Sequence, residues 1–256
     1  MQTNTIIAAD HSRHRAAQQL LAANPRLDLL PDGLPGPRQF KIKTADTTVR
    51  RFSANALLKH RYAWRGYQSV ALPADQTVNR ITLSAMEHEV TIGTITVVLD
   101  SPEGLAAEEA FGAEIGALRA DGNRVCEFTK LAIDPISGTK RVIAALFHVA
   151  YIIAHRLRGY DALVMEVNPR HVRYYERMLG ARVIGEQRLN RKDNAPAVLL
   201  CIDFGYIMEQ IGEFGGQEER VLEERSLYPL AFSLAEEAGM IARLMQAQKP
   251  ASSSLN

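Results

Sequence analysis

The segment from Cys126 to Ala181 constrains the fold most strongly, because its hydrophobic pattern changes from strand to helix and back to strand. Cys126–Ile133 alternates between apolar and polar residues and ends at an Asp-Pro pair, which predicts a strand followed by a turn. Val142–Ala154 is apolar nearly throughout, which predicts a buried helix. Ala162–Val167 is short, apolar and rich in β-branched residues, which predicts a buried strand. A strand–helix–strand unit of this length normally has a parallel, right-handed crossover, so the sequence predicts an α/β fold.

The remaining segments predict further strands and helices around this unit. Alternating segments that predict strands are Gln39–Ala45, Asn79–Met86, Val90–Leu99, Arg182–Leu189 and Ala197–Asp203. Segments with apolar residues at helical spacing are Thr48–Tyr62, Ala106–Leu118 and His171–Leu179. We therefore expect a mixed central sheet that is flanked by helices.

Composition excludes several classes of protein. The 256 residues carry a formal net charge of +1, so the chain lacks the strong positive field of nucleic-acid-binding proteins. The longest apolar run is about a dozen residues, too short for the roughly 20 that cross a membrane, and no signal peptide is visible. Cys126 and Cys201 lie in apolar runs without the spacing of a metal site, so we expect buried, reduced thiols and no bound metal. These features predict a soluble, cytoplasmic protein.

The chain divides into a core domain and two extensions. Residues 1–38 predict an N-terminal helical and linker extension, with a short helix at Ser12–Ala23 before a segment rich in Pro and Gly. Residues 39–205 form the core domain. Residues 206–256 predict a C-terminal helical extension with a disordered end at Pro250–Asn256. Apolar residues at helical spacing form one stripe from Leu227 to Met245, and Glu237 lies outside this stripe. The stripe predicts a helix that packs on the core domain or forms a homodimer.

The order of these segments resembles the Gcn5-related N-acetyltransferase (GNAT) fold, and within it the FeeM-type N-acyl amino acid synthases and the related LuxI-type autoinducer synthases. The resemblance covers roughly residues 40 to 204. It is carried by Arg61–Tyr67, Gly93–Val97, Glu127–Ala132, Asn168–Tyr175 and Met178–Gly180. It implies an N-acyltransferase that uses an acyl thioester.

Glu127 is the candidate base that deprotonates the acceptor amine, since a carboxylate on a central strand is costly to bury without a role. The alternative is a glutamate at a strand end that reaches solvent. Lys130 occupies a position where the LuxI-type family usually has Arg, so we also consider it catalytic. Side chains alternate along a strand, so Glu127 and Lys130 serve one site only if a β-bulge intervenes. Without a bulge, Lys130 is a solvated charge.

The resemblance also places the acyl donor. Backbone N–H groups along the central strand would contact the donor, at Phe128, Thr129, Leu131 and Ala132. The loop and helix start at Gly138, Thr139, Lys140 and Arg141 would hold phosphate. Only one Gly occurs there, where acetyl-CoA-binding GNAT proteins usually show Gly-x-Gly or Gly-x-Ala, so a phosphopantetheine arm on acyl carrier protein fits better than CoA. An ordinary capped helix with two exposed cations is the alternative.

The second short helix combines positive charge with candidate site residues. Arg170, His171, Arg173 and Arg177 make it basic, which favours docking of an acidic acyl carrier protein or simply forms a solvated face. Tyr175 matches the GNAT tyrosine that protonates the leaving thiolate, although the spacing also allows Tyr174, and either can be a core aromatic. Asn168, which ends the preceding strand, is a predicted substrate contact.

Four residues near the N-terminus predict substrate contacts. Arg61, Tyr62, Trp64 and Arg65 are similar to the lid of autoinducer synthases, where aromatic rings line an acyl tunnel and an arginine binds a carboxylate. The two Asp residues with which LuxI-type enzymes bind S-adenosylmethionine are not recognisable, since Asp75 stands alone. This argues against lactone synthesis and for a free amino acid as acceptor.

The sequence therefore predicts transfer of a long-chain acyl group from acyl carrier protein to the α-amine of an amino acid, with no permanently bound cofactor. Three alternatives remain: a CoA-dependent small-molecule acetyltransferase, a LuxI-type lactone synthase, and a catalytically silent acyl-binding module. The acceptor amino acid, the chain length and the oligomeric state are not predicted.

Overall fold

The computed structural model describes residues 5–10, 39–63, 71–72, 77–192 and 194–248. Its strands are β1 (Thr5–Asp10), β2 (Gln39–Thr44), β3 (Arg80–Glu87), β4 (Val90–Leu99), β5 (Val125–Ile133), β6 (Ala162–Val167), β7 (Arg182–Asn190) and β8 (Ala195–Asp203). Its α-helices are α2 (Thr48–Ala63), α3 (Glu108–Ala120), α4 (Lys140–Tyr151), α5 (Val172–Leu179), α6 (Phe204–Phe214) and α7 (Leu234–Gln248). A π-helical turn η1 (Ile152–Leu157) continues α4, and the short 3-10 helices are η2 (Pro169–His171), η3 (Glu218–Leu222) and η4 (Tyr228–Leu230).

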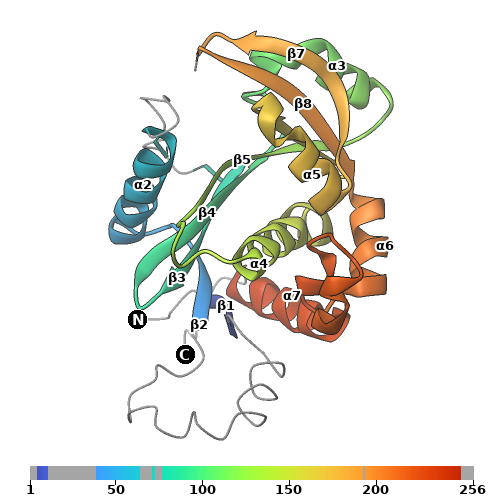
Figure 1. Cartoon of the computed structure of the whole chain (residues 1–256). Coiled ribbons are helices and arrows are strands. Elements are labelled where there is room, and N and C mark those ends of the chain that lie inside the picture. Colours follow the sequence, from blue (N-terminus) through green and yellow to red (C-terminus); the bar gives the residue numbers. More distant parts are fainter. Residues whose placement is uncertain (1–4, 11–38, 64–70, 73–76, 193, 249–256) are drawn as a thin grey trace, which may run out of the picture.

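The strands within these residues form one mixed sheet in the order β1-β2-β3-β4-β5-β6-β8-β7. Neighbouring strands are antiparallel except β5 and β6, which are parallel. Helix α4 covers one face, where its buried side chains join the main hydrophobic core. Helices α2 and α3 cover separate parts of the opposite face, over two smaller clusters (Figure 1). This arrangement confirms the predicted α/β fold with a mixed central sheet and flanking helices.

The predicted strand–helix–strand unit is present as β5, α4 and β6. Thr139 caps α4 by accepting a hydrogen bond from the Val142 backbone, and the apolar run that follows is buried on nearly every side. Such a helix suits the interior of a protein, because it is hydrophobic all round. No helix within the described residues combines the length and the apolar composition that a membrane span requires.

At the N-terminal edge, the structure differs from the sequence prediction. Strand β1 pairs with β2, so the sheet extends into a segment that was expected to be helix and linker. The pattern of β1 is too short to be distinguished from a linker without its partner strand. The helix predicted at Ser12–Ala23 and the disorder predicted at Pro250–Asn256 lie outside the described residues.

The C-terminal extension packs on the α4 side of the molecule, beside β1 and the end of α4 (Figure 1). The prediction of one continuous helix along the stripe from Leu227 to Met245 is wrong, because α7 begins at Leu234. Ser233 and Glu236 explain the start: the Ser233 hydroxyl accepts from the Glu236 backbone, and the Glu236 carboxylate accepts from the Ser233 backbone. This reciprocal capping box is a helix-initiation signal that the sequence contains.

Candidate active site

A cavity opens where the parallel strands β5 and β6 separate. Their pairing ends at Glu127 and Val164, and beyond that point the two strands diverge. The cavity has a volume of about 560 Å³ and is lined by the diverging strand ends, by parts of α2, α3, α4 and α5, and by the tip of the β7–β8 hairpin. It therefore connects the face of the sheet under α3 with the face under α4.

A β-bulge in β5 brings the two predicted catalytic side chains of this strand into the cavity. Thr96 pairs with Thr129 but Thr94 pairs with Ala132, so β5 contains one extra residue between the two pairs. Lys130 has a φ of +53°, which few residues other than glycine adopt, and its carbonyl accepts a hydrogen bond from the Thr94 hydroxyl at 2.9 Å. Because of this bulge, Glu127 and Lys130 line the same cavity.

Glu127 is a buried carboxyl group that backbone amides hold in place. Its side chain is 2% exposed, and Oε2 accepts hydrogen bonds from the N–H groups of Ala106 (2.8 Å) and Ala107 (3.4 Å). Burial raises the pKa of Glu127 to about 7, although the hydrogen bonds from the two backbone amides lower it. The negative charge of Glu166 raises this pKa further and Lys130 lowers it. A carboxyl group with a pKa near neutrality is suited to accept and release a proton at physiological pH.

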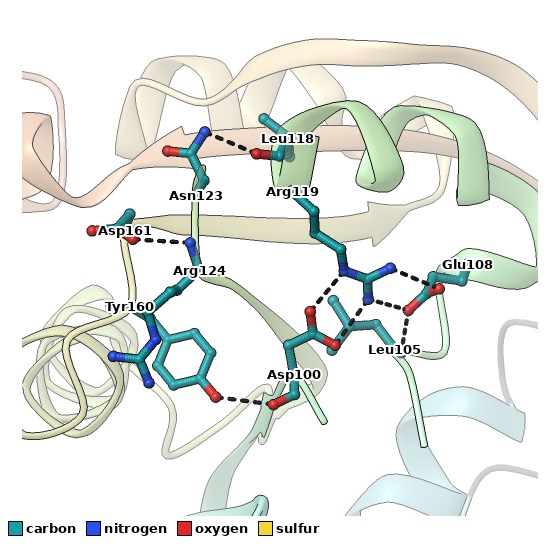
Figure 2. Close-up of polar contacts among 9 residues, drawn as sticks. All are labelled: Asp100, Leu105, Glu108, Leu118, Arg119, Asn123, Arg124, Tyr160 and Asp161. Atoms are coloured by element: carbon teal, nitrogen blue, oxygen red, sulfur yellow. Dashed lines mark hydrogen bonds and ion pairs between the residues drawn. The ribbon is translucent and has the colours of Figure 1, made fainter. Parts of the chain in front are cut away.

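An ion-pair network holds the segment that carries these amides (Figure 2). The Arg119 guanidinium binds both carboxylate oxygens of Asp100, at 2.7 and 2.8 Å, and also binds Glu108 at 3.0 Å. Glu108 in turn accepts a hydrogen bond from the Leu105 backbone at 2.7 Å. The Arg119 contact lowers the pKa of Glu108, and Arg119 itself is held firmly protonated. The connection between β4 and α3 is thereby fixed, so the Ala106 amide faces Glu127.

The predicted substrate contacts divide into three groups. Tyr62 and Asn168 line the cavity, and the Tyr62 hydroxyl donates to the Leu131 carbonyl at 3.3 Å. Asn168 caps η2 by accepting from the Arg170 backbone at 3.2 Å. Arg61 lies on α2 but does not line the cavity. Trp64 and Arg65 lie outside the described residues.

The structure distinguishes between the two candidate tyrosines. Tyr175 lines the cavity and packs edge-on against Phe147 of α4, with ring centroids 6.4 Å apart. Tyr174 packs against Tyr175 instead and is not part of the cavity wall, and burial raises its pKa. Of the two, Tyr175 is therefore placed to contact a bound substrate.

Not all predicted donor contacts reach the cavity. Phe128, Thr129 and Leu131 line it, whereas Ala132 packs under α2. The loop before α4 lies elsewhere, and Asp134 occupies its amides: Oδ1 accepts from Ile136 and Ser137, and the Asp134 carbonyl accepts from Gly138. An added Cβ at Gly138 would lie 2.5 Å from that carbonyl, so glycine allows this compact turn.

The two cations at the start of α4 have different surroundings. Arg141 forms an ion pair with Glu218 of the C-terminal extension, so it is not directed into the cavity. Lys140 is exposed and lines a separate surface hollow of about 300 Å³ with Arg177, Leu222 and Arg225. Gly138, Thr139, Lys140 and Arg141 thus form no continuous wall with Glu127.

Several cavity residues were not predicted from the sequence. The most notable are Glu109, Phe147, Glu166, Asn190 and Lys192. Glu166 could have been noticed, because it is the one acidic residue in the apolar strand Ala162–Val167. The others come from segments whose approach depends on tertiary packing. Within the ranges that the structure describes, no three His, Cys, Asp or Glu side chains gather as a metal site would require.

Comparison with known proteins gives one family match. The model of the family described as "N-acyl amino acid synthase FeeM" matches residues 53–203, more than half of the chain. Among solved structures, FeeM, an N-acyl amino acid synthase from uncultured soil microbes, is similar with a TM-score of 0.56 and 22% identity, over 65% of this chain and 90% of that chain. An acyl-CoA N-acyltransferase from Pseudomonas aeruginosa has a TM-score of 0.43 and 16% identity, over 63% and 97% of the two chains. No protein with a curated description matches the sequence. The GNAT-type fold predicted above is confirmed.

Proposed function

Because the chain belongs to the FeeM family of N-acyl amino acid synthases and is an N-acyltransferase, we propose that it transfers a long-chain acyl group from acyl carrier protein to the α-amine of an amino acid. The observation that carries this proposal is the position of Glu127. A buried carboxyl group with a pKa of about 7 lies in the cavity where β5 and β6 diverge, beside the bulge.

In the proposed reaction, the Glu127 carboxylate takes one proton from the acceptor ammonium group, directly or through a water molecule. The amine nitrogen then attacks the thioester carbonyl carbon, so a C–N bond forms and the C–S bond breaks. Tyr175 donates a proton to the leaving thiolate, and the second ammonium proton then restores the tyrosine hydroxyl. The net products are an amide, a thiol and one proton. Backbone N–H groups of the bulged strand would polarise the carbonyl, which is the form of catalysis that fixed dipoles provide.

Two features favour acyl carrier protein over CoA as the donor. The Ile136 and Ser137 amides before α4 already donate to Asp134, so this loop offers few N–H groups to the pyrophosphate of CoA. The hollow near the start of α4 is positively charged through Lys140, Arg177 and Arg225, and Leu222 at its edge is 92% exposed. Acyl carrier proteins are acidic, and a basic surface with an exposed apolar side chain would attract and hold one.

Product analysis tests the reaction. After expression in a bacterium, mass spectrometry is expected to find masses equal to fatty acids condensed with one amino acid. Acetylated amines would instead indicate the CoA-dependent acetyltransferase, and acyl lactones the LuxI-type activity. Acyl binding without any product would indicate a silent module, and each of these results contradicts the proposal.

The donor is tested with purified protein and one acyl chain supplied either on acyl carrier protein or on CoA. Lys140→Ala should raise the KM for acyl carrier protein by up to about tenfold, since one charge-assisted contact is lost. Arg141→Ala is the comparison, because Arg141 pairs with Glu218 and should affect folding more than donor binding. Equal KM values for wild type and Lys140→Ala would remove Lys140 from the donor site.

A further inference from the structure

A second carboxylate shares the cavity with Glu127. In the parallel pair β5–β6, Glu127 is in register with Val164, and side chains two residues apart lie on the same face. Glu166 therefore lies on the same face as Glu127. Val164 packs in the cluster under α3 that also contains Phe111, which places this face on the α3 side of the sheet.

Glu166 is held in position by the neighbouring hairpin. Its Oε1 accepts a hydrogen bond from the Asn190 side-chain amide, and Asn190 is the last residue of β7. Lys192 follows in the turn of the same hairpin, and all three side chains line the cavity. The hairpin tip thus brings an amide to the carboxylate of β6 and a cation to the same cavity.

The charges in this cavity match a molecule that carries both signs. The anionic side chains are Glu109, Glu127 and Glu166, and the cationic or titratable ones are Lys130, Arg170, His171 and Lys192. A free amino acid has an ammonium group and a carboxylate group on one carbon atom. The negative charges of Glu127 and Glu166 repel each other, and the positive charge of a bound ammonium group would offset that repulsion.

We propose that Glu166, positioned by Asn190, binds the α-ammonium group of the acceptor amino acid, and that Lys192 binds its α-carboxylate. This assignment rests on the proposed function and adds the acceptor site to it. Glu166 orients the amine while Glu127 takes the proton. Lys192 accounts for a preference for amino acids over amines that lack a carboxylate.

Steady-state kinetics test this site. The acceptor is the one of the twenty common L-amino acids that is acylated fastest. Glu166→Gln should raise the KM for that amino acid by about tenfold or more, with the KM for the acyl donor unchanged. Lys192→Ala should lower the preference for the amino acid over its primary amide by about tenfold. Arg191→Ala is the matched control, because Arg191 is exposed in the same turn but does not line the cavity.

A pH profile distinguishes a role of Glu166 in substrate binding from a purely structural role in β6. The negative charge of Glu166 raises the pKa of Glu127, so Glu166→Gln should move the acid limb of kcat/KM to lower pH. The other charged groups in the cavity stay in place, namely Glu109, Lys130, Arg170, His171 and Lys192. Asn190→Ala keeps the charge but loosens Glu166, so it should raise the amino-acid KM by a smaller factor and leave the limb in place.

The outcomes distinguish the two proposals. Wild-type protein that makes no N-acyl amino acid contradicts the proposed function. If the wild-type protein is inactive, Lys192 can still be tested by calorimetry, which compares the binding of N-dodecanoylglycine with the binding of its primary amide. Wild type and Arg191→Ala should prefer the acid, and Lys192→Ala should not. Two results would overturn the acceptor site. One is active Glu166→Gln protein that keeps the wild-type KM and acid limb. The other is Lys192→Ala protein that keeps the wild-type preference for the carboxylate over the primary amide.

Discussion

Two buried glutamates of this protein have nearly the same exposure and opposite surroundings. Glu127 is 2% exposed and Glu237 is 3% exposed. Glu127 accepts hydrogen bonds from two uncharged amides, and its pKa is raised to about 7. Glu237 contacts His148 at 3.1 Å and the Arg156 guanidinium at 3.0 Å. A buried carboxyl group whose hydrogen bonds come from neutral amides titrates near neutral pH, whereas a carboxylate in a buried ion pair holds segments together.

The partners of Glu237 show what it holds together. His148 Nδ1 accepts a hydrogen bond from the Phe232 backbone, which leaves Nε2 to donate to Glu237. Glu237 is at the start of α7, whereas His148 is in α4 and Arg156 in η1. This cluster therefore attaches the C-terminal extension to the core domain, and its role is structural.

Exchange of Glu127 for Gln should have the largest effect on catalysis. Glu127→Gln keeps the size of the side chain but cannot accept a proton at neutral pH, so turnover should fall by roughly 10²–10⁴. Glu237→Gln, the matched control, should keep turnover within about twofold in folded protein. Steady-state rates of both variants, from preparations with verified folding, make this comparison. Full activity of Glu127→Gln would remove Glu127 from the mechanism.

Exchange of Glu237 should have the larger cost in stability. Glu237→Gln removes a buried charge that contacts the buried His148 and the more exposed Arg156, and we expect the free energy of unfolding to fall by about 2 kcal/mol. Denaturant unfolding at pH 7 measures this difference. An unchanged free energy of unfolding would mean that the cluster does not hold the extension in place.

Exchange of Glu127 should stabilise the protein at high pH, whereas exchange of Glu237 destabilises it. The folded protein raises the pKa of Glu127 from the ordinary 4.5 to about 7, so the folded state resists its ionisation. The wild-type free energy of unfolding should therefore fall as the pH rises from 4.5 to 7. Glu127→Gln should lack this fall and be more stable at pH 8, by at most about 3 kcal/mol. Parallel unfolding curves at pH 4.5 and pH 8 check this, and a constant difference between the two proteins would contradict it.

The sequence was sufficient to predict the core domain, because its elements have strong local patterns. The alternation in Cys126–Ile133 and the apolar runs of Val142–Ala154 and Ala162–Val167 correspond to β5, α4 and β6. Glu127 was identified because a carboxylate on a central strand is unusual. The bulge at Lys130 was expected only if both side chains served one site, and the structure contains it.

The rest depended on contacts between distant segments. Glu237 lies off the apolar stripe of its helix, so the sequence placed it on the polar side. It is buried because His148, 89 residues earlier in the chain, meets it there. Arg141 pairs with Glu218, a contact that no local pattern predicts, and its predicted role in phosphate binding stays a prediction. Asn190 and Lys192 reach the cavity only through the fold of a hairpin.

The pH dependence of kcat/KM for the amino acid tests the central claim about Glu127 most directly. If Glu127 is the base, kcat/KM should fall about tenfold per pH unit below an apparent pKa near 7. In Glu127→Gln this limb should disappear and leave a low, flat rate over the same range. The same limb at the same pH in both proteins would show that another group accepts the proton, and would contradict the account of this site.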